Sequence, residues 1–208
     1  MPVYELIYFN AYGRAEPIRQ CFAYAGIKYT DTRLEFSEWQ VIKNNKSKIP
    51  YGVLPVLLID GKPLCESHAI TRYVAEVAGL DGKADLLEVA RLDQAYELCR
   101  GFFDAVKPYW LCLFGFNPED PEILKAEVFL PAVEKYFPNI IELLRPNYIF
   151  GRNGITYVDL YWANIIEFYK KHARDVIEKY PQFMEQERLI KAVPKLQEYF
   201  ATRPKCPF

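Results

Sequence analysis

The stretch from Ile49 to Ser67, IPYGVLPVLLIDGKPLCES, decides the fold of this 208-residue chain. The apolar run at 56–59 predicts a buried strand, and Asp60-Gly61 is a dipeptide typical of a two-residue hairpin turn. A second, shorter strand is expected at 63–65. The stretch therefore predicts an antiparallel hairpin that leads directly into a helix.

Two sets of unpaired backbone groups are expected to flank this hairpin. A proline cannot donate to a sheet, so Pro55 is expected at the first residue of its strand or on an edge, which leaves the backbone N–H and C=O of Leu54 free. A helix beginning at Glu66 and Ser67 adds N–H groups without intrahelical partners. A tight hairpin brings both sets together, and they suit a small, anionic, peptide-like ligand.

The segments around the hairpin predict an α/β domain over residues 1–79. Strand and helix patterns alternate at 3–9, 14–25, 28–34, 37–45 and, after the hairpin, 67–78. Ser37 is the expected N-cap of the fourth element. The order β-α-β-α-β-β-α predicts a parallel strand pair early in the chain and an antiparallel edge formed by the hairpin.

Beyond a linker at 80–85 the pattern is helical, and the sequence predicts an all-α domain over 86–208. A long amphipathic helix is expected at 86–106. A later helix, ending near residue 144, contains Pro131 and Pro138, and a kink or break is expected there.

A helix start is also marked within the all-α region. Thr156 and Asp159 have the spacing of a capping box, with Asp in place of Glu, ahead of an apolar run at 160–168. This pattern predicts a buried helix that begins directly after Thr156.

Composition excludes several classes of function. With 26 Lys and Arg against 27 Asp and Glu, nucleic acid and anionic membranes are not expected as main partners. Five scattered cysteines without a Cys-x-x-Cys pair exclude a thioredoxin-type dithiol and fit free thiols in a reducing cytosol. Two histidines allow no His-rich metal cluster. The chain start lacks a signal pattern and no apolar run reaches the roughly 18 residues that span a bilayer, so we expect a cytoplasmic protein.

Tyr8 ends the first strand, at the edge where α/β sheets gather ligands. Its phenol either donates a hydrogen bond to an anion or is an ordinary strand tyrosine with a satisfied hydroxyl. Arg14 is likewise either a ligand contact or an ion-paired residue of the first helical turn.

Two further pairs have both a binding and a structural interpretation. Trp39 and Lys43 are four residues apart and project from one helix face, either toward a carboxylate or as a packing tryptophan below a surface lysine. Glu66 and Ser67 either receive the amino and carboxylate groups of a ligand at a helix N-terminus or are a cap with a solvated neighbour.

In their joint order and spacing, these residues resemble a cytosolic glutathione S-transferase over essentially the whole chain. The sigma class, which includes haematopoietic-type prostaglandin D synthases and many nematode transferases, is the most similar. The motifs that carry the resemblance are Tyr8-Phe9, Gly13-Arg14-Ala15-Glu16, Trp39 with Lys43, Leu54-Pro55, Glu66-Ser67-His68-Ala69-Ile70 with Arg72-Tyr73, and Gly154-x-Thr156-x-x-Asp159.

The resemblance implies a thioredoxin-like first domain with a cis Leu54-Pro55 peptide and with glutathione as co-substrate. The cysteinyl part of glutathione would pair with the Leu54 backbone, its glycyl carboxylate would lie on Trp39 and Lys43, and its γ-glutamyl end would lie at the helix start. The glutathione-binding residues implied are Arg14, Trp39, Lys43, Gly52, Val53, Leu54, Glu66 and Ser67.

The resemblance also makes Tyr8 the catalytic residue, acting as a hydrogen-bond donor to the sulfur and not as a base. A free thiol with a pKa near 8.5 is mostly protonated at neutral pH, and a donor to the sulfur favours the nucleophilic thiolate. Arg14 would add positive charge. The apolar pocket implied for the second substrate is lined by Phe9, Gly13, Phe102, Phe103 and Phe208.

One position departs from the family pattern. Related enzymes carry an aspartate on the long helix that reaches across a dimer to the glutathione amine, and Gly101 occupies that position here. The metal effect among the prostaglandin synthases relies on an acidic cluster in the same place, so no metal site is expected. A homodimer is still implied, with Tyr51 where several classes insert an aromatic side chain into the partner.

Three functions are consistent with these residues. The first is conjugation of glutathione to small hydrophobic electrophiles, a detoxification reaction. The second is a glutathione-dependent isomerisation of prostaglandin H-like endoperoxides, against which the missing acidic cluster argues. The third is a non-catalytic, ligand-binding protein that keeps the transferase fold.

Overall fold

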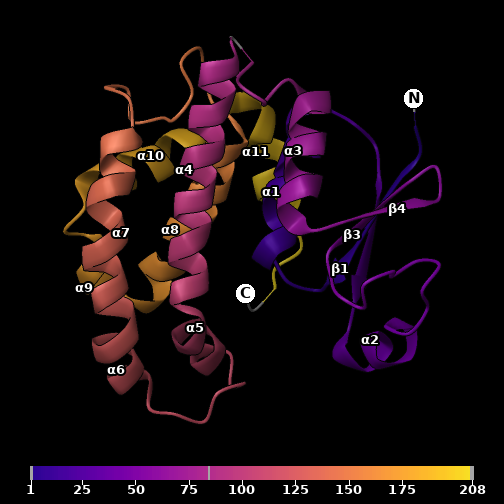
Figure 1. The fold of residues 1–208 in the computed structure, drawn as a ribbon, viewed down its shortest axis with the longest axis horizontal. Helices are drawn as coiled ribbons and strands as arrows, with labels where there is room; N and C mark the ends of the chain where they lie inside the picture. The colour runs from indigo at the N-terminus through magenta and orange to yellow at the C-terminus, as the bar shows by residue number, and fades with distance from the viewer. Residues whose placement is uncertain (1, 84, 207–208) are drawn as a thin grey trace. The chain divides into compact units, whose positions relative to one another are not determined.

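The computed structural model describes residues 2–83 and 85–206 (Figure 1). These residues form two compact units, one made of residues 2–81 together with 191–206, and the other of residues 82–190. The boundary at 81–82 falls in the predicted linker, whereas the last segment, predicted as part of the helical domain, packs with the first unit.

The first unit is an α/β fold, as predicted. Its sheet has the order β2-β1-β3-β4, with β1 parallel to β2 and antiparallel to β3, and with β3 and β4 forming the hairpin. Its elements are β1 (Tyr4–Phe9), η1 (Gly13–Ala15), α1 (Glu16–Ala25), β2 (Thr30–Leu34), α2 (Phe36–Ile42), β3 (Val56–Ile59), β4 (Lys62–Cys65), α3 (Ser67–Ala78), η3 (Pro194–Leu196) and α11 (Gln197–Thr202).

The two faces of the sheet are covered by different helices. Side chains alternate along a strand, so Tyr4 and Tyr8 of β1 share one face and Phe9 lies on the other. The Tyr4 ring packs on Phe22 of α1, with centroids 5.2 Å apart. Phe9 meets Trp39 of α2 edge to face at 5.8 Å. Tyr8 therefore belongs to the α1 face.

Two helix starts differ from the sequence prediction. Glu35, and not Ser37, is the N-cap of α2, where it forms a reciprocal capping box with Glu38. A glutamate that accepts from the N3 backbone satisfies the same orphan donor as a serine would, so the short side chain of Ser37 is not needed. In α3, Glu66 occupies the N-cap position and Ser67 is the first helical residue.

The second unit is helical, as predicted. Its buried centre is aromatic: Phe102 lies within 6.0 Å of Phe129, Phe137, Trp162 and Tyr169, measured between ring centroids. Its elements are α4 (Leu86–Ala105), α5 (Lys107–Leu113), α6 (Pro121–Leu124), the π-helix η2 (Lys125–Phe129), α7 (Leu130–Leu143), α8 (Tyr157–His172), α9 (Arg174–Ile177) and α10 (Pro181–Lys191).

Two sequence signals of this unit are confirmed in detail. The irregularity expected near Pro131 is the π-helical turn that immediately precedes α7, because a proline N has no hydrogen to bond the carbonyl four residues earlier. At Pro138, by contrast, α7 is not broken and continues to Leu143. Thr156 and Asp159 form the expected capping box at the start of α8.

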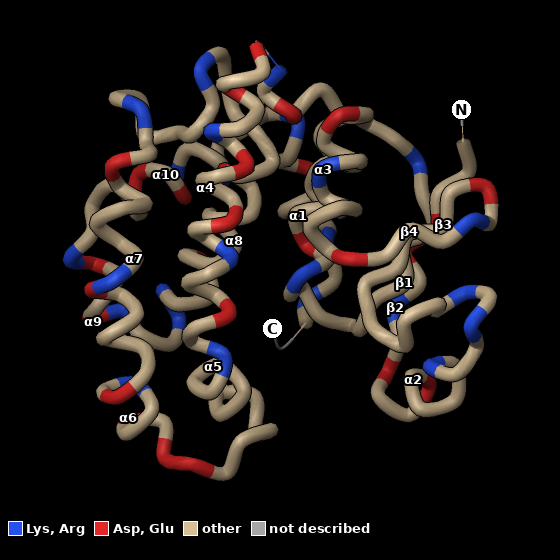
Figure 2. The backbone as a smooth tube through the Cα atoms, viewed as in Figure 1, with Lys and Arg blue, Asp and Glu red and all other residues tan. Residues whose placement is uncertain are grey.

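Charged residues of both signs are interspersed along the described elements of each unit (Figure 2), in keeping with the net charge of -1. None of the helices in the described ranges is long and apolar enough to cross a membrane.

Candidate functional site

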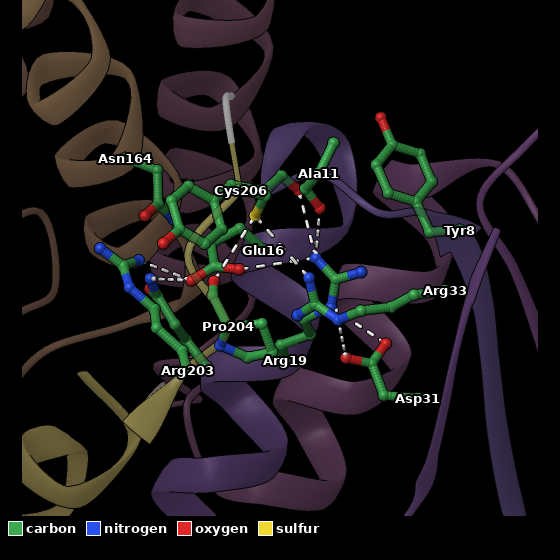
Figure 3. Close-up of polar contacts among 12 residues, drawn as sticks. Tyr8, Ala11, Glu16, Arg19, Asp31, Arg33, Asn164, Arg203, Pro204 and Cys206 are labelled. Atoms are coloured by element: carbon green, nitrogen blue, oxygen red, sulfur yellow. Dashed lines mark hydrogen bonds and ion pairs between the residues drawn. The ribbon is translucent and has the colours of Figure 1, made fainter. Parts of the chain in front are cut away.

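The hydroxyl of Tyr8 is poised as a donor. It accepts a hydrogen bond from the backbone N–H of Arg14 at 3.2 Å, so one of its lone pairs is used and its own proton remains available to a ligand. Burial raises the pKa of Tyr8, while the Arg14 N–H and the charges of Arg14 and Arg19 lower it. The phenol therefore stays protonated at neutral pH. Figure 3 shows its hydroxyl pointing away from the ion pairs of Arg19 with Glu16 and Asp31.

Gly13 allows the close approach between this loop and the tyrosine. Its φ is +40°, and a Cβ atom built at this position would lie 2.7 Å from the Tyr8 hydroxyl oxygen. The glycine is therefore required both by the left-handed backbone and by the space that Tyr8 occupies.

Replacing Gly13 with alanine is expected to lower kcat/KM of the reaction at this site roughly tenfold, because a displaced donor no longer meets the reacting atom. Steady-state kinetics measure the change. Gly26→Ala is the matched control: its φ is +64°, but a Cβ there meets nothing within 4 Å, so only backbone strain is added. Equal losses in both variants would show that strain alone, and not the contact with Tyr8, causes the effect.

The backbone of Leu54 is available, as predicted from the proline that follows it. The Leu54-Pro55 peptide is cis. No described residue makes a backbone hydrogen bond to the N–H or C=O of Leu54. The Leu54 side chain packs against the core cluster that includes Ile7 and Val56, which fixes the position of the free groups.

The start of α3 offers a second set of donors beside Leu54. Val56 pairs with Cys65 in the antiparallel hairpin, so the residues before 56 lie opposite those after 65. The first intrahelical bond is donated by the N–H of Ile70 to the carbonyl of Glu66, which leaves the N–H groups of residues 67–69 directed out of the helix end. Glu66 has φ +70° and ψ +113°, a strained backbone that is typical of functional sites.

The sequence left open whether Trp39 and Lys43 bind a carboxylate or are a packing tryptophan and a surface lysine. Their environments are consistent with both. Trp39 packs against the core cluster on the α2 face, yet its indole N–H has no hydrogen-bond partner within residues 2–83 and 85–206. The Lys43 ammonium donates to the Gln40 side chain at 2.5 Å. The Lys43 carbonyl lies 3.7 Å from the Cβ position of Gly52 (φ +66°), next to Val53, which is 45% exposed.

The residues predicted for the apolar pocket have different environments. Phe9 is half-buried and touches the rings of Tyr8 and Trp39. Phe103 is half-buried and stacks on Trp110, with centroids 5.5 Å apart. Phe208 lies outside the described residues.

Phe102 is a correction. It has no exposed surface and lies in the aromatic centre of the second unit, so it cannot line a pocket. Phe102 follows Gly101 on α4, and at Gly101 a Cβ would meet the Tyr136 ring of α7 at 3.1 Å. This stretch of α4 therefore faces α7, and sequence alone does not orient adjacent aromatic residues on a helix that is apolar on more than one side.

Sequence reasoning missed Arg19, which is fully buried and lies 5.8 Å from the centroid of the Tyr8 ring. The signal was present, because Arg19 falls on the same helical face as the apolar residues Ala15, Ile18 and Phe22. An arginine on a core-facing stripe requires buried acceptors, which makes it a candidate for a structural or functional role.

Comparison with known proteins agrees with this arrangement. Residues 4–76 match the glutathione S-transferase N-terminal domain, and residues 103–203 match the glutathione S-transferase C-terminal domain. A probable glutathione S-transferase 6 of Caenorhabditis elegans is 36% identical over 207 residues, covering 99% of this chain and 98% of the relative. A hematopoietic prostaglandin D synthase of Gallus gallus is 32% identical over 209 residues, covering 99% and 98%.

The solved structures agree as well. The crystal structure of a monomeric glutathione S-transferase from the hookworm Necator americanus superposes with a TM-score of 0.92 at 35% identity, over 99% of this chain and 100% of the hookworm chain. The chain therefore belongs to the glutathione S-transferase family, which confirms the predicted family, the thioredoxin-like and helical fold class, and transferase as the enzyme class.

Proposed function

We propose that this protein conjugates reduced glutathione to small hydrophobic electrophiles, with Tyr8 stabilising the thiolate. The observation that carries the proposal is the Tyr8 hydroxyl, which accepts from the Arg14 N–H and keeps its own proton for the sulfur. A donor to the sulfur lowers the pKa of the thiol, and each unit corresponds to about 1.4 kcal/mol in favour of the thiolate. The attacking thiolate then displaces a leaving group or adds to the electrophile.

The free polar groups of the first unit support the placement of glutathione. The Leu54 N–H and C=O pair with the cysteinyl backbone, as one strand pairs with another. The N–H groups at the start of α3 and the Ser67 hydroxyl receive the γ-glutamyl carboxylate. The Trp39 indole and the Lys43 ammonium hold the glycyl carboxylate.

Turnover of a chlorodinitrobenzene-type electrophile with glutathione tests this function, with the S-conjugate identified by mass spectrometry. Retention on a glutathione resin without turnover across a broad panel of electrophiles would instead support a non-catalytic binding protein.

Prostaglandin H to D isomerisation is the second candidate, favoured by the similarity to prostaglandin D synthases of chicken and rat. Gly101 argues against it, because the acidic cluster associated with that activity is absent at this point of α4. Product analysis after incubation with the endoperoxide and glutathione decides between the two reactions.

We also propose the sigma class, a cytoplasmic location, a role in detoxification and a homodimer. The exposed ring of Tyr51, 68% accessible and adjacent to Gly52, supports insertion into a partner subunit. The hookworm structure of a monomeric relative shows that the fold does not require a dimer. Sedimentation equilibrium distinguishes the two states.

Glu66→Ala is expected to raise the KM for glutathione roughly tenfold, because Glu66 pairs with the γ-glutamyl amine and Gly101 provides no carboxylate to share that contact. Steady-state kinetics at saturating electrophile measure it. Glu66→Gln keeps the side-chain length and the backbone strain but removes the charge, and it should raise KM nearly as much. An unaltered KM in both variants would contradict the assigned role of Glu66.

A further inference from the structure

Arg19 ties the loop before the catalytic region to the body of the first unit. Its Nη1 donates to the carbonyl of Ala11 at 2.7 Å and lies 3.4 Å from that of Tyr12, while its Nε donates to Asp31 Oδ1 at 3.1 Å. The side chain has no exposed surface. Charge-assisted bonds in a dry environment are strong, so Arg19 fixes the loop at residues 11–12.

This loop sets the partner of Tyr8. The carbonyls that Arg19 holds immediately precede Gly13 and Arg14, and the Arg14 N–H bonds to the Tyr8 hydroxyl. The Arg19 guanidinium also lies 5.8 Å from the Tyr8 ring centroid. Arg19 thus controls both the geometry and the local charge of Tyr8 without pointing at a ligand.

Glu16 holds Arg19 from the other side. It is fully buried, with Oε2 lying 3.5 Å from Arg19 Nη1 and Oε1 accepting from Arg203 Nη1 at 2.7 Å. Figure 3 shows Glu16 between these two arginines. A buried carboxylate is costly unless cations pair with it. The cations that pair with Glu16 are Arg19 of α1 and Arg203 of the C-terminal segment, residues 191–206.

Arg203 directly follows α11, and its side chain is held by several contacts. Its side chain is 8% exposed, and its guanidinium lies 4.3 Å from the ring centroid of Tyr12 and 5.2 Å from that of Phe200. Tyr12 belongs to the loop that Arg19 holds. Arg203 therefore contacts the loop directly at the Tyr12 ring. It is also linked to the loop indirectly, through Glu16 and then Arg19.

We propose that Arg203 and Glu16 are positioning residues for the transferase reaction, acting through Arg19 on the loop that orients the Tyr8 hydroxyl. This inference rests on the proposed function. Without Arg203, Glu16 keeps Arg19 as its cationic partner, with Gln20 Nε2 3.5 Å from its Oε1, and draws the guanidinium away from the carbonyls of the loop. The Arg14 N–H then no longer holds the Tyr8 hydroxyl in place. The positive charge near the phenol, which makes it a stronger hydrogen-bond donor, also decreases.

Other charged and titratable groups complete the surroundings of this relay, which is defined as Arg203, Glu16 and Arg19. Asp31 is shared with Arg33, whose Nη1 lies 3.8 Å from Cys206 Sγ. The groups that face the relay are Tyr29, Asp31 and Arg33 around β2, Tyr199 and Cys206 in the C-terminal segment, and Arg14 beside Tyr8.

Arg203→Ala tests the proposal in the full-length protein. The pKa of the glutathione thiol in the binary complex, read from thiolate absorbance, is expected to rise by about 0.5–1 unit. At neutral pH, kcat/KM should fall roughly fivefold while KM for glutathione changes less than twofold. Arg203→Lys keeps the charge and should recover at least half of each loss.

Lys195→Ala is the matched control. Lys195 also anchors the C-terminal segment on α1, with its ammonium 4.3 Å from the Tyr24 ring centroid, but it does not belong to the relay. It should leave the thiol pKa unchanged. If Arg203→Ala fails to fold, Arg203→Gln, which keeps a donor for Glu16 without the charge, is measured in its place and should raise the thiol pKa by a similar amount.

The outcomes are distinct. A thiol pKa that is unmoved in the Arg203 variants, or moved as much by Lys195→Ala, overturns the relay. A thiol pKa that does not respond to Tyr8→Phe overturns the proposed function itself. Because the absorbance reading needs no electrophile, a failure to find a substrate does not affect either test.

Discussion

Tyr8→Phe is expected to lower kcat/KM for the proposed conjugation about 100-fold at neutral pH, the usual consequence of removing one donor to a developing or fixed anion. The variant keeps the ring, its edge contact with Phe9 and its place on β1, and it loses only the hydroxyl. The pKa of the bound thiol should rise by about 1–2 units toward the value of free glutathione. Thiolate absorbance and initial rates measure the two effects.

The dependence of the rate on pH checks the direction in which Tyr8→Phe shifts the pKa of the bound thiol. Only the thiolate reacts, so the rate of each protein increases with pH until its bound thiol is ionised. The profile of Tyr8→Phe should be displaced to higher pH, and the difference in rate between the two proteins should therefore shrink as the pH increases. A difference that stays constant with pH would mean that Tyr8 does not act on the thiol.

Tyr4→Phe is the matched control for this experiment. Tyr4 lies four residues earlier on the same strand and the same face, and it is 3% exposed. Its loss of a buried hydroxyl reports the general cost of the substitution in this sheet. It should leave kcat/KM within about twofold, because the Tyr4 ring packs on Phe22 and its hydroxyl is not the group that meets the sulfur.

The sequence predicts the fold well where local chemistry decides it. Asp60-Gly61 sets the hairpin, and Leu54-Pro55 sets the start of its first strand, because turn residues and prolines act through their own backbone geometry. Tyr8 could be placed at a strand end because parallel strands expose their carboxyl ends at one edge. These features need no knowledge of distant contacts.

The missed features depend on tertiary packing. Phe102 is buried because α7 and α8 close over it, and no local pattern distinguishes it from Phe103. Arg19 and Glu16 are separated from Arg203 by more than 180 residues of sequence, so their pairing follows only from the docking of the C-terminal segment on α1. Ser37 is the better N-cap by residue type, whereas Glu35 takes that position through its reciprocal capping box with Glu38.

The carboxylate of Asp159 is fully buried at the start of α8 and accepts several hydrogen bonds. Its Oδ2 accepts from the backbone N–H and the hydroxyl of Thr156 at 2.8 and 2.9 Å. Its Oδ1 accepts from the Phe150 N–H at 2.9 Å and lies 3.4 Å from Gln186 Nε2. One side chain therefore joins the start of α8 to the preceding loop and to α10.

Asp159→Asn is expected to lower the free energy of unfolding by about 3 kcal/mol. The new side-chain NH2 group replaces one of the two accepting oxygens, so the N–H and O–H donors that bonded to this oxygen are left buried and unpaired. Urea unfolding, with an unchanged slope, measures it. Asp120→Asn is the control. Asp120 caps α6 from an exposed position, where asparagine caps equally well, so its effect should stay below about 0.5 kcal/mol.

The pH dependence of the Asp159 effect follows from its burial, which raises the pKa of Asp159 to about 6 against the hydrogen bonds from Phe150 and Thr156 that lower it. Since the folded pKa lies above the unfolded one, the folded state binds the proton more tightly. The linked stabilisation, about 3 kcal/mol, is fully present below pH 4 and is lost as the pH rises through 6. The stability difference between the natural protein and Asp159→Asn should therefore be larger at pH 4 than at pH 7. A difference that is independent of pH over this window would show that Asp159 is already ionised in the folded state at pH 4, held so by its four donors.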